Sequence, residues 1–532
     1  MSDRTDWVAI PTLGDLIVRR AAMAPDRDAI VFPEERETGA ELLDESIKAG
    51  RSLLGLGIKP GEAIAILMPN HIDFAHVLYG AALVGIRALL VNARYKATEL
   101  AYVLENADAV AVITTDVVSE YVDFVPLLRD ATTNHDVPLL RQLVLLGSSS
   151  PEGFVDRAAF DAAADTITEA YVHELRESVR VRDVAIMMYT SGTTAQPKGC
   201  LITHEALVRT GISVASRWHM PEDEVFWDPL PFFHMGAMLQ LTATLYAGGT
   251  FVTMTHFEPG AALRQIHEEH PTFIFPCFPT ITQSLIHHPD FEQTDLSSIR
   301  GLLDTGPKES LQEVERRFGV PVVTSYGLTE AGGVIAFGHL EDSIEKRSTT
   351  GGRPFRGMEA RIVDPDTGVE LPPNTPGAVL LRGVGLFEGY YKDPGQTAKA
   401  MEGGWLNTGD LGVIDEDGRV AYRGRFKDML KVGGENVSAL EIEAYLGTHP
   451  KVKVVAVASV PDEKYTEVPA AFVEIVPGET LTEDELITYC KDQIANFKIP
   501  RYVRFVTEWP MSATKIQKFK LRSDLLAELG LE

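Results

Sequence analysis

The chain contains the segment Tyr189-Thr190-Ser191-Gly192-Thr193-Thr194-Ala195-Gln196-Pro197-Lys198-Gly199, which overlaps the end of an apolar run at 184–189. The apolar run predicts a strand, and the residues after it predict a loop rich in Gly, Ser and Thr. Backbone N–H groups of such a loop can converge on phosphate oxygens, and glycine allows a close approach. Lys198 adds a positive charge suited to phosphate. The Gly-x4-Gly-Lys-Ser/Thr spacing of a Walker A loop is absent, and taken alone the segment is equally typical of a polar surface turn.

Strand and helix patterns alternate on the N-terminal side of this loop. Short apolar runs lie at 63–68, 88–91 and 109–113, and helical periodicity covers 42–56 and 98–106. Strands that alternate with helices predict a parallel sheet with helices on its faces. The sequence therefore predicts an α/β fold, with a large N-terminal domain of parallel sheets flanked by helices.

The pattern changes twice on the C-terminal side. Short strand-like runs broken by Gly and Pro cover 380–425 and predict a small β subdomain. After Asp428 a compact α+β pattern returns, with helices near 439–446 and 483–495 and strands near 454–459 and 470–476. A chain of 532 residues is too long for one core. We expect an N-terminal domain over 1–426 and a smaller, mobile C-terminal domain over 427–532, with a hinge near Lys427.

Charge and cysteine content exclude several classes of protein. The net charge is −27, from 49 basic and 76 acidic residues, which argues against a general nucleic-acid-binding surface. Cys200, Cys277 and Cys490 are far apart, so neither a disulfide framework nor zinc-ligand spacing is present. The apolar stretch 74–91 is interrupted by Gly and charged residues, and predicts a buried helix and strand, not a membrane span. The polar N-terminus lacks the apolar core of a signal peptide, so we expect a cytoplasmic location.

Five further motifs follow the phosphate loop in order along the chain. They are Pro231-Phe232-Phe233-His234-Met235, Tyr326-Gly327-Leu328-Thr329-Glu330, Trp405-Leu406-Asn407-Thr408-Gly409-Asp410, Gly424-Arg425-Phe426-Lys427-Asp428 and Lys431-Val432-Gly433-Gly434-Glu435-Asn436-Val437. The ordered set resembles the adenylate-forming superfamily of acyl-CoA synthetases, peptide-synthetase adenylation domains and luciferases, over nearly the whole chain. The resemblance implies an acyl-CoA ligase (acid-thiol ligase) that uses ATP, Mg²⁺ and coenzyme A. A hydrophobic carboxylic acid reacts with ATP to give an acyl-adenylate (acyl-AMP), and CoA then displaces AMP.

The resemblance also assigns the nucleotide and metal sites. Tyr326 offers a flat face for adenine; without the flanking motif, a core tyrosine would be the preferred interpretation. Asp410 can accept from the ribose hydroxyls and Arg425 can donate to the same sugar, while Glu330 and Thr190 are suited to Mg²⁺. The nucleotide-binding set comprises Thr190, Ser191, Gly192, Thr193, Thr194, Lys198, Thr305, Tyr326, Gly327, Leu328, Thr329, Asp410 and Arg425.

Catalytic, acyl and CoA roles follow from the same motifs. The expected catalytic residues are Lys515, His234, Glu330 and Thr190, with His234 as a gate beside the substrate carboxylate. Lys427 is the expected hinge, and the expected CoA residues are Lys431, Gly433 and Gly434. The candidate acyl pocket consists of Phe233, His234, Met235, Met238, Phe278 and Leu328, residues that are equally expected as plain core. A medium to large hydrophobic acid fits this set, with polycyclic and aromatic acids as candidates.

The last motif departs from the family pattern. The family reads Pro-x-Thr-x-Thr-Gly-Lys-Ile, whereas this chain reads Pro510-Met511-Ser512-Ala513-Thr514-Lys515-Ile516-Gln517-Lys518, so the glycine is missing and the loop is one residue shorter. One residue spans about 3.3–3.8 Å of backbone. Either a neighbouring segment relaxes and Lys515 still reaches the α-phosphate, or adenylation is impaired. In the second case the chain performs only thioesterification and needs acyl-AMP from a separate adenylating ligase.

The sequence differs from the family pattern at two further places, and it leaves two other functions open. Ala195 replaces a glycine of the phosphate loop, and Asp304-Thr305-Gly306-Pro307 replaces the small residues expected beside adenine. A stand-alone adenylation enzyme that loads a carrier protein has the same motifs. A non-catalytic nucleotide-binding homologue is the third interpretation, and intact Glu330, Asp410 and Arg425 argue against it.

Overall fold

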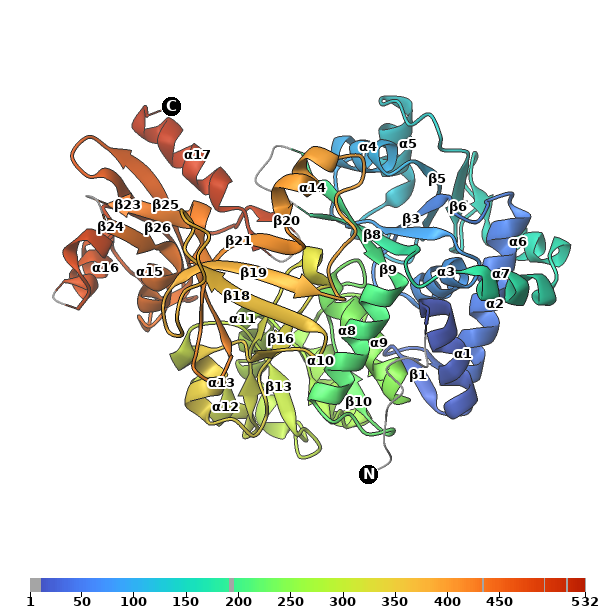
Figure 1. Cartoon of the computed structure of the whole chain (residues 1–532), viewed down its shortest axis with the longest axis horizontal. Coiled ribbons are helices and arrows are strands. Elements are labelled where there is room, and N and C mark those ends of the chain that lie inside the picture. Colours follow the sequence, from blue (N-terminus) through green and yellow to red (C-terminus); the bar gives the residue numbers. More distant parts are fainter. Residues whose placement is uncertain (1–10, 191–195, 433–434, 492, 513–514, 532) are drawn as a thin grey trace.

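The computed structural model describes residues 11–190, 196–432, 435–491, 493–512 and 515–531, without the side chains at 427, 435, 436, 512 and 515 (Figure 1). Several predicted site residues lie outside these described residues: Ser191, Gly192, Thr193, Thr194, Gly433 and Gly434, together with the side chains of Lys427 and Lys515.

The first large sheet has the strand order β7-β6-β5-β3-β4-β8-β9. All its neighbouring strands are parallel except β8 and β9, which form an antiparallel pair. The predicted strands at 63–68, 88–91, 109–113 and 184–189 all lie in this sheet. Its strands are β3 (Ala63–Leu67), β4 (Arg87–Leu90), β5 (Ala109–Thr114), β6 (Gln142–Leu145), β7 (Val155–Asp156), β8 (Val184–Thr190) and β9 (Lys198–Thr203).

A second seven-stranded sheet has the order β14-β13-β12-β10-β11-β1-β2 and is parallel except at its β1–β2 edge. Its strands are β1 (Asp28–Val31), β2 (Arg36–Thr38), β10 (Val225–Trp227), β11 (Thr250–Val252), β12 (Phe273–Ile274), β13 (Gly301–Leu303) and β14 (Val322–Val323). The α/β fold class with parallel sheets and flanking helices is confirmed.

The helices of this large part cover and separate the two sheets (Figure 1). Helix α9 is buried along its whole length except at Gly236, begins after His234 and ends at Gly248, whose left-handed φ of 92° favours glycine. The helices are α1 (Leu13–Met23), α2 (Gly39–Gly55), α3 (Ile72–Leu83), α4 (Ala97–Asn106), α5 (Phe124–Thr133), α6 (Arg157–Ala163), α7 (Glu169–Ser178), α8 (His204–Arg217), α9 (Met235–Ala247), α10 (Pro259–Glu269), α11 (Pro279–Ile286), α12 (Lys308–Phe318), α13 (Ile344–Thr349) and α14 (Pro394–Ala400).

Two smaller sheets complete the N-terminal part. One joins β15 (Ser325–Tyr326), β16 (Ala336–Phe337) and β17 (Arg353–Pro354), and carries the Tyr326 motif. The other is the predicted β subdomain, and it is antiparallel throughout. Its strands are β18 (Met358–Val363), β19 (Gly377–Gly383), β20 (Met401–Glu402), β21 (Trp405–Ile414) and β22 (Val420–Arg425).

The C-terminal part is α+β, as expected, and has its own sheet and hydrophobic clusters. The helix expected over 483–495 is wrong in length, because α16 ends at Cys490. Ile494 continues the apolar spacing of Leu486 and Cys490 and packs against the same hydrophobic cluster, but the backbone leaves the helix at Lys491, which is extended. The elements are β23 (Met429–Val432), β24 (Glu435–Ser438), α15 (Ala439–Leu446), β25 (Val452–Asp462), β26 (Thr466–Ile475), α16 (Glu483–Cys490), β27 (Tyr502–Phe505), β28 (Met511–Ser512), β29 (Lys515–Ile516) and α17 (Lys518–Leu529). The boundary at 426/427 and the mobility of this part stay predictions.

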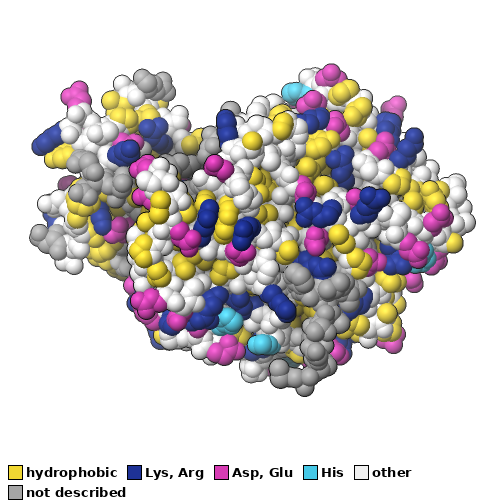
Figure 2. Space-filling model, viewed as in Figure 1, with side chains coloured by type: hydrophobic (Ala, Val, Ile, Leu, Met, Phe, Trp, Pro, Cys, Tyr) yellow, Lys and Arg dark blue, Asp and Glu magenta, His cyan; other side chains and the backbone are white. Residues whose placement is uncertain are grey.

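The surface charge and the helix lengths concern two classes that the sequence argued against, nucleic-acid-binding proteins and membrane-spanning proteins. Basic and acidic side chains are interspersed on the face shown in Figure 2. Across the described ranges, the structure has no helix that is long and apolar enough to cross a membrane. The stretch 74–91 instead forms most of α3 and the strand β4, as its interruptions predicted.

Candidate active site

The two strands that flank the phosphate loop are locked in register. Thr190 pairs with Lys198 across β8 and β9, so the loop between them is anchored on both sides. The Lys198 ammonium donates to the Gln396 side chain (3.2 Å) and lies 4.9 Å from the centre of the Tyr390 ring. The loop residues 191–195 themselves lie outside the described part of the chain.

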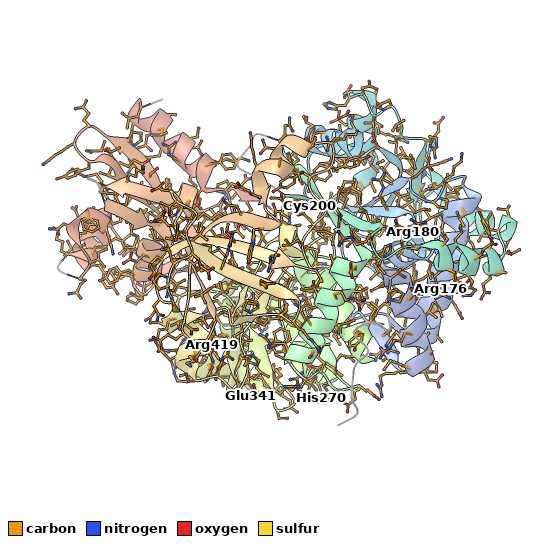
Figure 3. All side chains as sticks on the ribbon, viewed as in Figure 1. Arg176, Arg180, Cys200, His270, Glu341 and Arg419 are labelled. Carbon is orange, nitrogen blue, oxygen red and sulfur yellow. The ribbon has the colours of Figure 1, made fainter. Side chains whose placement is uncertain are left out.

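Tyr390 links this hairpin to Glu330. Its hydroxyl donates to Glu330 Oε1 (2.9 Å), and its backbone forms an isolated antiparallel bridge with Cys200 of β9. Cys200 is labelled in Figure 3. Burial, and then the Glu330 charge, raise the pKa of the Cys200 thiol well above its usual value. Cys200 is therefore a protonated, buried thiol 3.9 Å from Thr190 Oγ1 and unsuited to nucleophilic catalysis. The fold thus brings a lysine, a carboxylate and Thr190 together around one tyrosine.

The segment after β15 approaches a second backbone very closely. A Cβ on Gly327 would lie 2.2 Å from the carbonyl oxygen of Gly333, so only glycine fits there. A Cβ on Gly333 would in turn lie 2.9 Å from Cβ of Met235, which places the start of α9 against this segment. Leu328 and Thr329 lie half-buried between these points and Glu330, so the Tyr326 motif and the Met235 motif form one wall.

Asp410 lies directly opposite Arg425 in the register of β21 and β22. Arg425 Nε lies 3.1 Å from Asp410 Oδ1, and the Tyr326 hydroxyl donates to Asp410 Oδ2 (2.8 Å). Burial, and then the Asp410 charge, raise the pKa of Tyr326 well above its usual value, so its hydroxyl keeps its proton. The three residues that the sequence assigned to adenine and ribose are therefore in direct contact.

Two tyrosines of this site were missed by the sequence analysis. Tyr422 stacks on Tyr326 with ring centres 6.2 Å apart, and it is 39% exposed whereas Tyr326 is only 5% exposed. Tyr422 is thus the ring with the accessible face. Tyr390 is the other missed residue. The aromatic residue in the strand pattern at 420–425 was a signal for Tyr422, but nothing in the local sequence shows that Tyr390 contacts Glu330.

The predicted acyl residues lie in one hydrophobic cluster. Phe233, Met235 and Met238 are buried in it, and Phe278 and Leu328 pack against it half-buried. His234 is the N-cap residue of α9, and its ring lies 4.8 Å from that of Phe233. This arrangement agrees with both interpretations that the sequence left open, an acyl pocket and a plain core.

A buried carboxyl group lies at the segment that departs from the family pattern. Asp304 follows β13 and accepts from the backbone N–H of Thr305 (2.8 Å) and from the Thr282 hydroxyl. The Thr305 hydroxyl donates to the carbonyl oxygen of Cys277 (2.7 Å). Burial raises the pKa of Asp304 to about 7. The network ties the β13 exit to the start of α11, beside Phe278.

This carboxyl group predicts a pH-dependent stability. The folded pKa lies above the ordinary aspartate value of about 3.9, so between about pH 4 and pH 7 the unfolded chain releases a proton that the folded chain retains. We expect Asp304→Asn, which keeps the acceptor for Thr305, to raise the melting temperature relative to wild type increasingly over this window. The gain should be absent below it and constant above it. Thermal unfolding at several pH values measures this, and a pH-independent difference would contradict the assignment.

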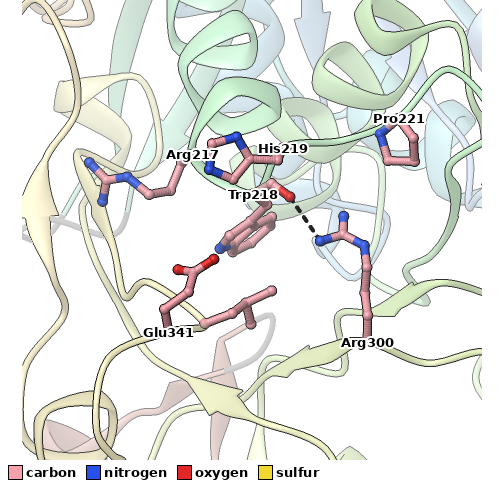
Figure 4. Close-up of a pocket in the computed structure, with 7 residues that line it drawn as sticks. Arg217, Trp218, His219, Pro221, Arg300 and Glu341 are labelled. Carbon is pink, nitrogen blue, oxygen red and sulfur yellow. Dashed lines mark hydrogen bonds between the residues drawn. The ribbon is translucent and has the colours of Figure 1, made fainter. Parts of the chain in front are cut away.

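Two cavities lie beside these elements. One of about 520 Å³ is lined by residues 388–401, including Tyr390, and so opens next to the Lys198–Gln396 contact. The other, of about 230 Å³, lies at the end of α8 between Arg217, Trp218 and Arg300 (Figure 4). Its lining contains none of the residues that the sequence assigned to a site.

The chain matches known families and proteins over nearly its full length. Residues 17–391 match the AMP-binding enzyme family and residues 441–515 match the AMP-binding enzyme C-terminal domain. A putative acyl-CoA synthetase, YngI of Bacillus subtilis, is 36% identical over 98% of both chains. A Mycobacterium tuberculosis ligase for a methyl-dioxo-octahydroindenyl propanoyl:CoA is 34% identical and covers 97% of this chain and 99% of its own. The crystal structure of the anthranilate CoA ligase AuaEII with anthranoyl-AMP superposes with a TM-score of 0.87, at 27% identity over 98% of both chains.

The chain belongs to the AMP-binding enzymes, the class of adenylate-forming proteins. Its relatives place it within that class among the acyl-CoA ligases, and use of ATP, through AMP, and of CoA follows from this membership. The suspected resemblance is confirmed.

Proposed function

We propose that the protein converts a medium to large hydrophobic carboxylic acid into its CoA thioester through an acyl-adenylate. The observation that carries this proposal is the pair of contacts around the nucleotide motifs, Glu330–Tyr390–Lys198 on one side and Tyr326–Asp410–Arg425 on the other. The two groups of contacts together contain two carboxylates, two cations and two aromatic rings. We assign these side chains to a phosphate, a ribose and an adenine. One structural relative is an anthranilate CoA ligase, and one sequence relative is a ligase for a bicyclic propanoyl:CoA. These names support a substrate class that includes aromatic and polycyclic acids.

The chemistry requires positioning and no protein nucleophile. In the first step a carboxylate oxygen of the acid bonds to the α-phosphorus of ATP, and the bond to pyrophosphate breaks. In the second step the CoA sulfur bonds to the acyl carbon, its proton is released, and AMP leaves with the electron pair of the broken C–O bond. We assign Lys198, Lys515 and Arg425 to offset negative charge, and His234 to hold the attacking carboxylate.

Glu330 fits a divalent cation site of the kind that ATP enzymes use. Mg²⁺ in such sites takes one or two protein carboxylates and relies on phosphate oxygens for other ligands. Among the described residues there is no cluster of three or more His, Cys, Asp or Glu side chains suited to a metal, so Glu330 with Thr190 and the ATP phosphates is the fitting set. Bound there, Mg²⁺ would neutralise phosphate charge.

The C-terminal part supplies the rest of the proposed site. Ser438 at the start of α15 donates to the carbonyl oxygen of Arg423 (2.9 Å), so this part contacts the ribose strand β22 directly. Lys431 lies exposed on β23, and its backbone N–H donates to Glu467 (2.7 Å). We assign Lys427 as the hinge, and Lys431, Gly433 and Gly434 to the pantetheine path.

A second candidate function is thioesterification alone. Ser512 pairs with Lys515 and Met511 with Ile516, which closes β28 and β29 around a connection of two residues. We infer that the missing residue sets Lys515 back from the α-phosphate. We propose that adenylation is slower than thioester formation. In the extreme case the chain does not adenylate at all, and a separate ligase supplies its acyl-AMP.

The test uses the purified chain with ATP, Mg²⁺, CoA and a panel of hydrophobic acids, with acyl-AMP and acyl-CoA followed by mass spectrometry. We expect acyl-CoA to form with CoA and no acyl transfer to a phosphopantetheinyl carrier protein. Transfer to the carrier alone would identify a carrier-loading enzyme. A nucleotide-induced thermal shift without acyl-AMP or thioester would contradict the ligase and favour a binding protein.

Tyr422 gives a direct prediction for the adenine site. Stacking of a base on an aromatic ring is worth roughly 1–3 kcal/mol, so Tyr422→Ala should raise the KM for ATP by about tenfold. Tyr121→Ala, which removes an exposed tyrosine between β5 and α5, is the control and should leave this KM unchanged. If both variants changed the KM for ATP equally, adenine would not stack on Tyr422.

A further inference from the structure

A buried amide joins the first large sheet to the loop that leads to His234. Asn70 follows β3 and is only 3% exposed. Its amide nitrogen donates to the carbonyl oxygen of Leu230 (2.8 Å), and its amide oxygen accepts from the backbone N–H of Phe232 (2.7 Å). One side chain therefore holds the backbone at two points that lie 160 and 162 residues away along the chain.

The chemistry of an amide suits both of these backbone groups. The Leu230 carbonyl oxygen needs a donor and the Phe232 N–H needs an acceptor, and asparagine carries both on one short side chain. The amide nitrogen also donates to Thr253 Oγ1 (3.1 Å), in the segment after β11. The three partners together fix the orientation of the amide, and removal of the amide leaves buried backbone groups without a partner at a cost in free energy.

The loop held by this amide runs from the end of β10 to the start of α9. Its backbone is bonded at successive points: the Leu230 N–H donates to Asp228 Oδ1 (2.8 Å), and the His234 N–H donates to the Pro231 carbonyl oxygen (2.9 Å). His234 lies two residues beyond Phe232 and is the N-cap residue of α9. Fixing the backbone at Leu230 and Phe232 therefore limits where His234 can lie.

Apolar packing and the amide restrain different parts of this loop. The centre of the Phe232 ring lies 5.4 Å from that of Phe74 on α3 and 6.0 Å from that of Phe251 on β11, which holds the side chain between α3 and the second sheet. Leu230 reaches the first turn of α9, where a Cβ on Gly236 would lie 2.8 Å from Leu230 Cδ1. Apolar contacts restrain the position of the loop, whereas hydrogen bonds are directional and fix the orientation of its backbone.

We propose that Asn70 is a positioning residue for acyl-AMP formation: its amide clamps the loop at Leu230 and Phe232 and so sets the place of the His234 ring. This inference rests on the proposed function, which assigns His234 to the attacking carboxylate. Supporting residues of this kind hold a catalytic group near its productive geometry, and a displacement of about 1 Å can cost on the order of a hundredfold in rate. Asn70 acts through the loop and needs no contact with the substrate.

A purely structural role of this amide predicts a different result. An amide that only ties β3 to the second sheet would lower the free energy of unfolding when removed, and any effect on the rate would be the same whether or not His234 is present. The effect of a positioning residue on the rate disappears when the group that it positions is absent. A double-mutant cycle therefore separates the two roles.

The experiment measures single-turnover formation of acyl-AMP in four chains: wild type, Asn70→Ala, His234→Ala and the double variant. We expect Asn70→Ala to slow wild type by about tenfold to a hundredfold, and to slow His234→Ala by less than about twofold. The KM for ATP should stay as in wild type, because the three hydrogen bonds that the described structure gives Asn70 involve none of the nucleotide motifs. The melting temperature should fall equally in both backgrounds.

A second readout needs no turnover and so also serves a chain that adenylates very slowly. A non-reactive acyl sulfamate of adenosine mimics acyl-AMP, and its dissociation constant is measured for the same four chains by calorimetry. The acyl carbonyl oxygen of this mimic takes the place of the carboxylate that we assign to His234. Asn70→Ala should therefore weaken its binding several-fold in wild type and leave it unchanged in His234→Ala.

Thr114→Val is the matched control. The Thr114 hydroxyl is buried and donates to the carbonyl oxygen of Leu67 in β3 (2.6 Å), so its removal deletes a buried hydrogen bond to the same strand and leaves the loop untouched. It should lower the melting temperature and leave acyl-AMP formation as in wild type. Asn70→Asp, which keeps the acceptor for the Phe232 N–H, is the second variant should Asn70→Ala fail to fold, and its cycle with His234→Ala is read in the same way.

The outcomes for the inference and for the proposed function differ. Equal slowing by Asn70→Ala with and without His234, or no slowing in either background, overturns this inference alone. Failure of wild type to bind the mimic and to yield acyl-AMP or acyl-CoA from any acid of the panel counts against the proposed function.

Discussion

Glu330→Gln is expected to slow acyl-AMP formation by roughly a hundredfold or more. Loss of one preorganised electrostatic contact to a reacting phosphate commonly costs 10²–10³ in rate. Gln keeps the size of Glu330 and can still accept from the Tyr390 hydroxyl, so the contact that the structure shows at 2.9 Å should survive. The change therefore removes the charge and leaves the geometry. Single-turnover formation of acyl-AMP measures the effect.

Tyr390→Phe is the matched control, because it removes the hydroxyl that contacts Glu330 and keeps the carboxylate. We expect it to slow the reaction by only a few-fold, because the Glu330 carboxylate keeps its charge. A second readout is the Mg²⁺ dependence of the ATP-induced thermal shift, which should move to higher Mg²⁺ in Glu330→Gln and not in Tyr390→Phe. Wild-type rates in Glu330→Gln would exclude Glu330 from the phosphate site.

Insertion of one glycine between Thr514 and Lys515 is expected to speed acyl-AMP formation by up to about a hundredfold. Displacement of a catalytic group by about 1 Å can cost that much in rate, and the inserted residue restores the length of the family motif. The insertion turns the two-residue connection between Ser512 and Lys515 into one of three residues, a length that β-hairpins also accept. Thioester formation from synthetic acyl-AMP should stay at its wild-type rate, because CoA reacts in a separate step.

Two controls isolate the position of the lysine. Lys515→Ala in the insertion variant should abolish the gain. A glycine inserted after Gly478, at an exposed turn with a φ of 89° in the same part of the chain, should leave both half-reactions unchanged. Equal acyl-AMP rates for wild type and the Thr514–Lys515 insertion would show that the short hairpin is harmless and that the protein is an ordinary two-step ligase.

The strands at 63–68, 88–91, 109–113 and 184–189 show how far local patterns reach. Each was predicted, and each lies in the first large sheet, because a run of apolar residues closed by turn residues has few alternatives to a buried strand. The helix expected over 483–495 shows the limit of this reasoning. The apolar spacing continues past Cys490 to Ile494, whereas the helix ends before Lys491, so the end of this helix depends on packing that local periodicity does not record.

The sequence by itself determined the α/β class, the family and the identity of the nucleotide motifs, since these depend on residue order and local periodicity. Tyr326, Asp410 and Arg425 could be grouped in advance because each belongs to a recognisable motif. Only the tertiary structure placed Tyr390 on Glu330, Tyr422 on Tyr326 and the Asn70 amide on the loop that leads to His234. Such contacts depend on strand register and on the way layers stack, which join residues that are far apart along the chain and that no local pattern relates.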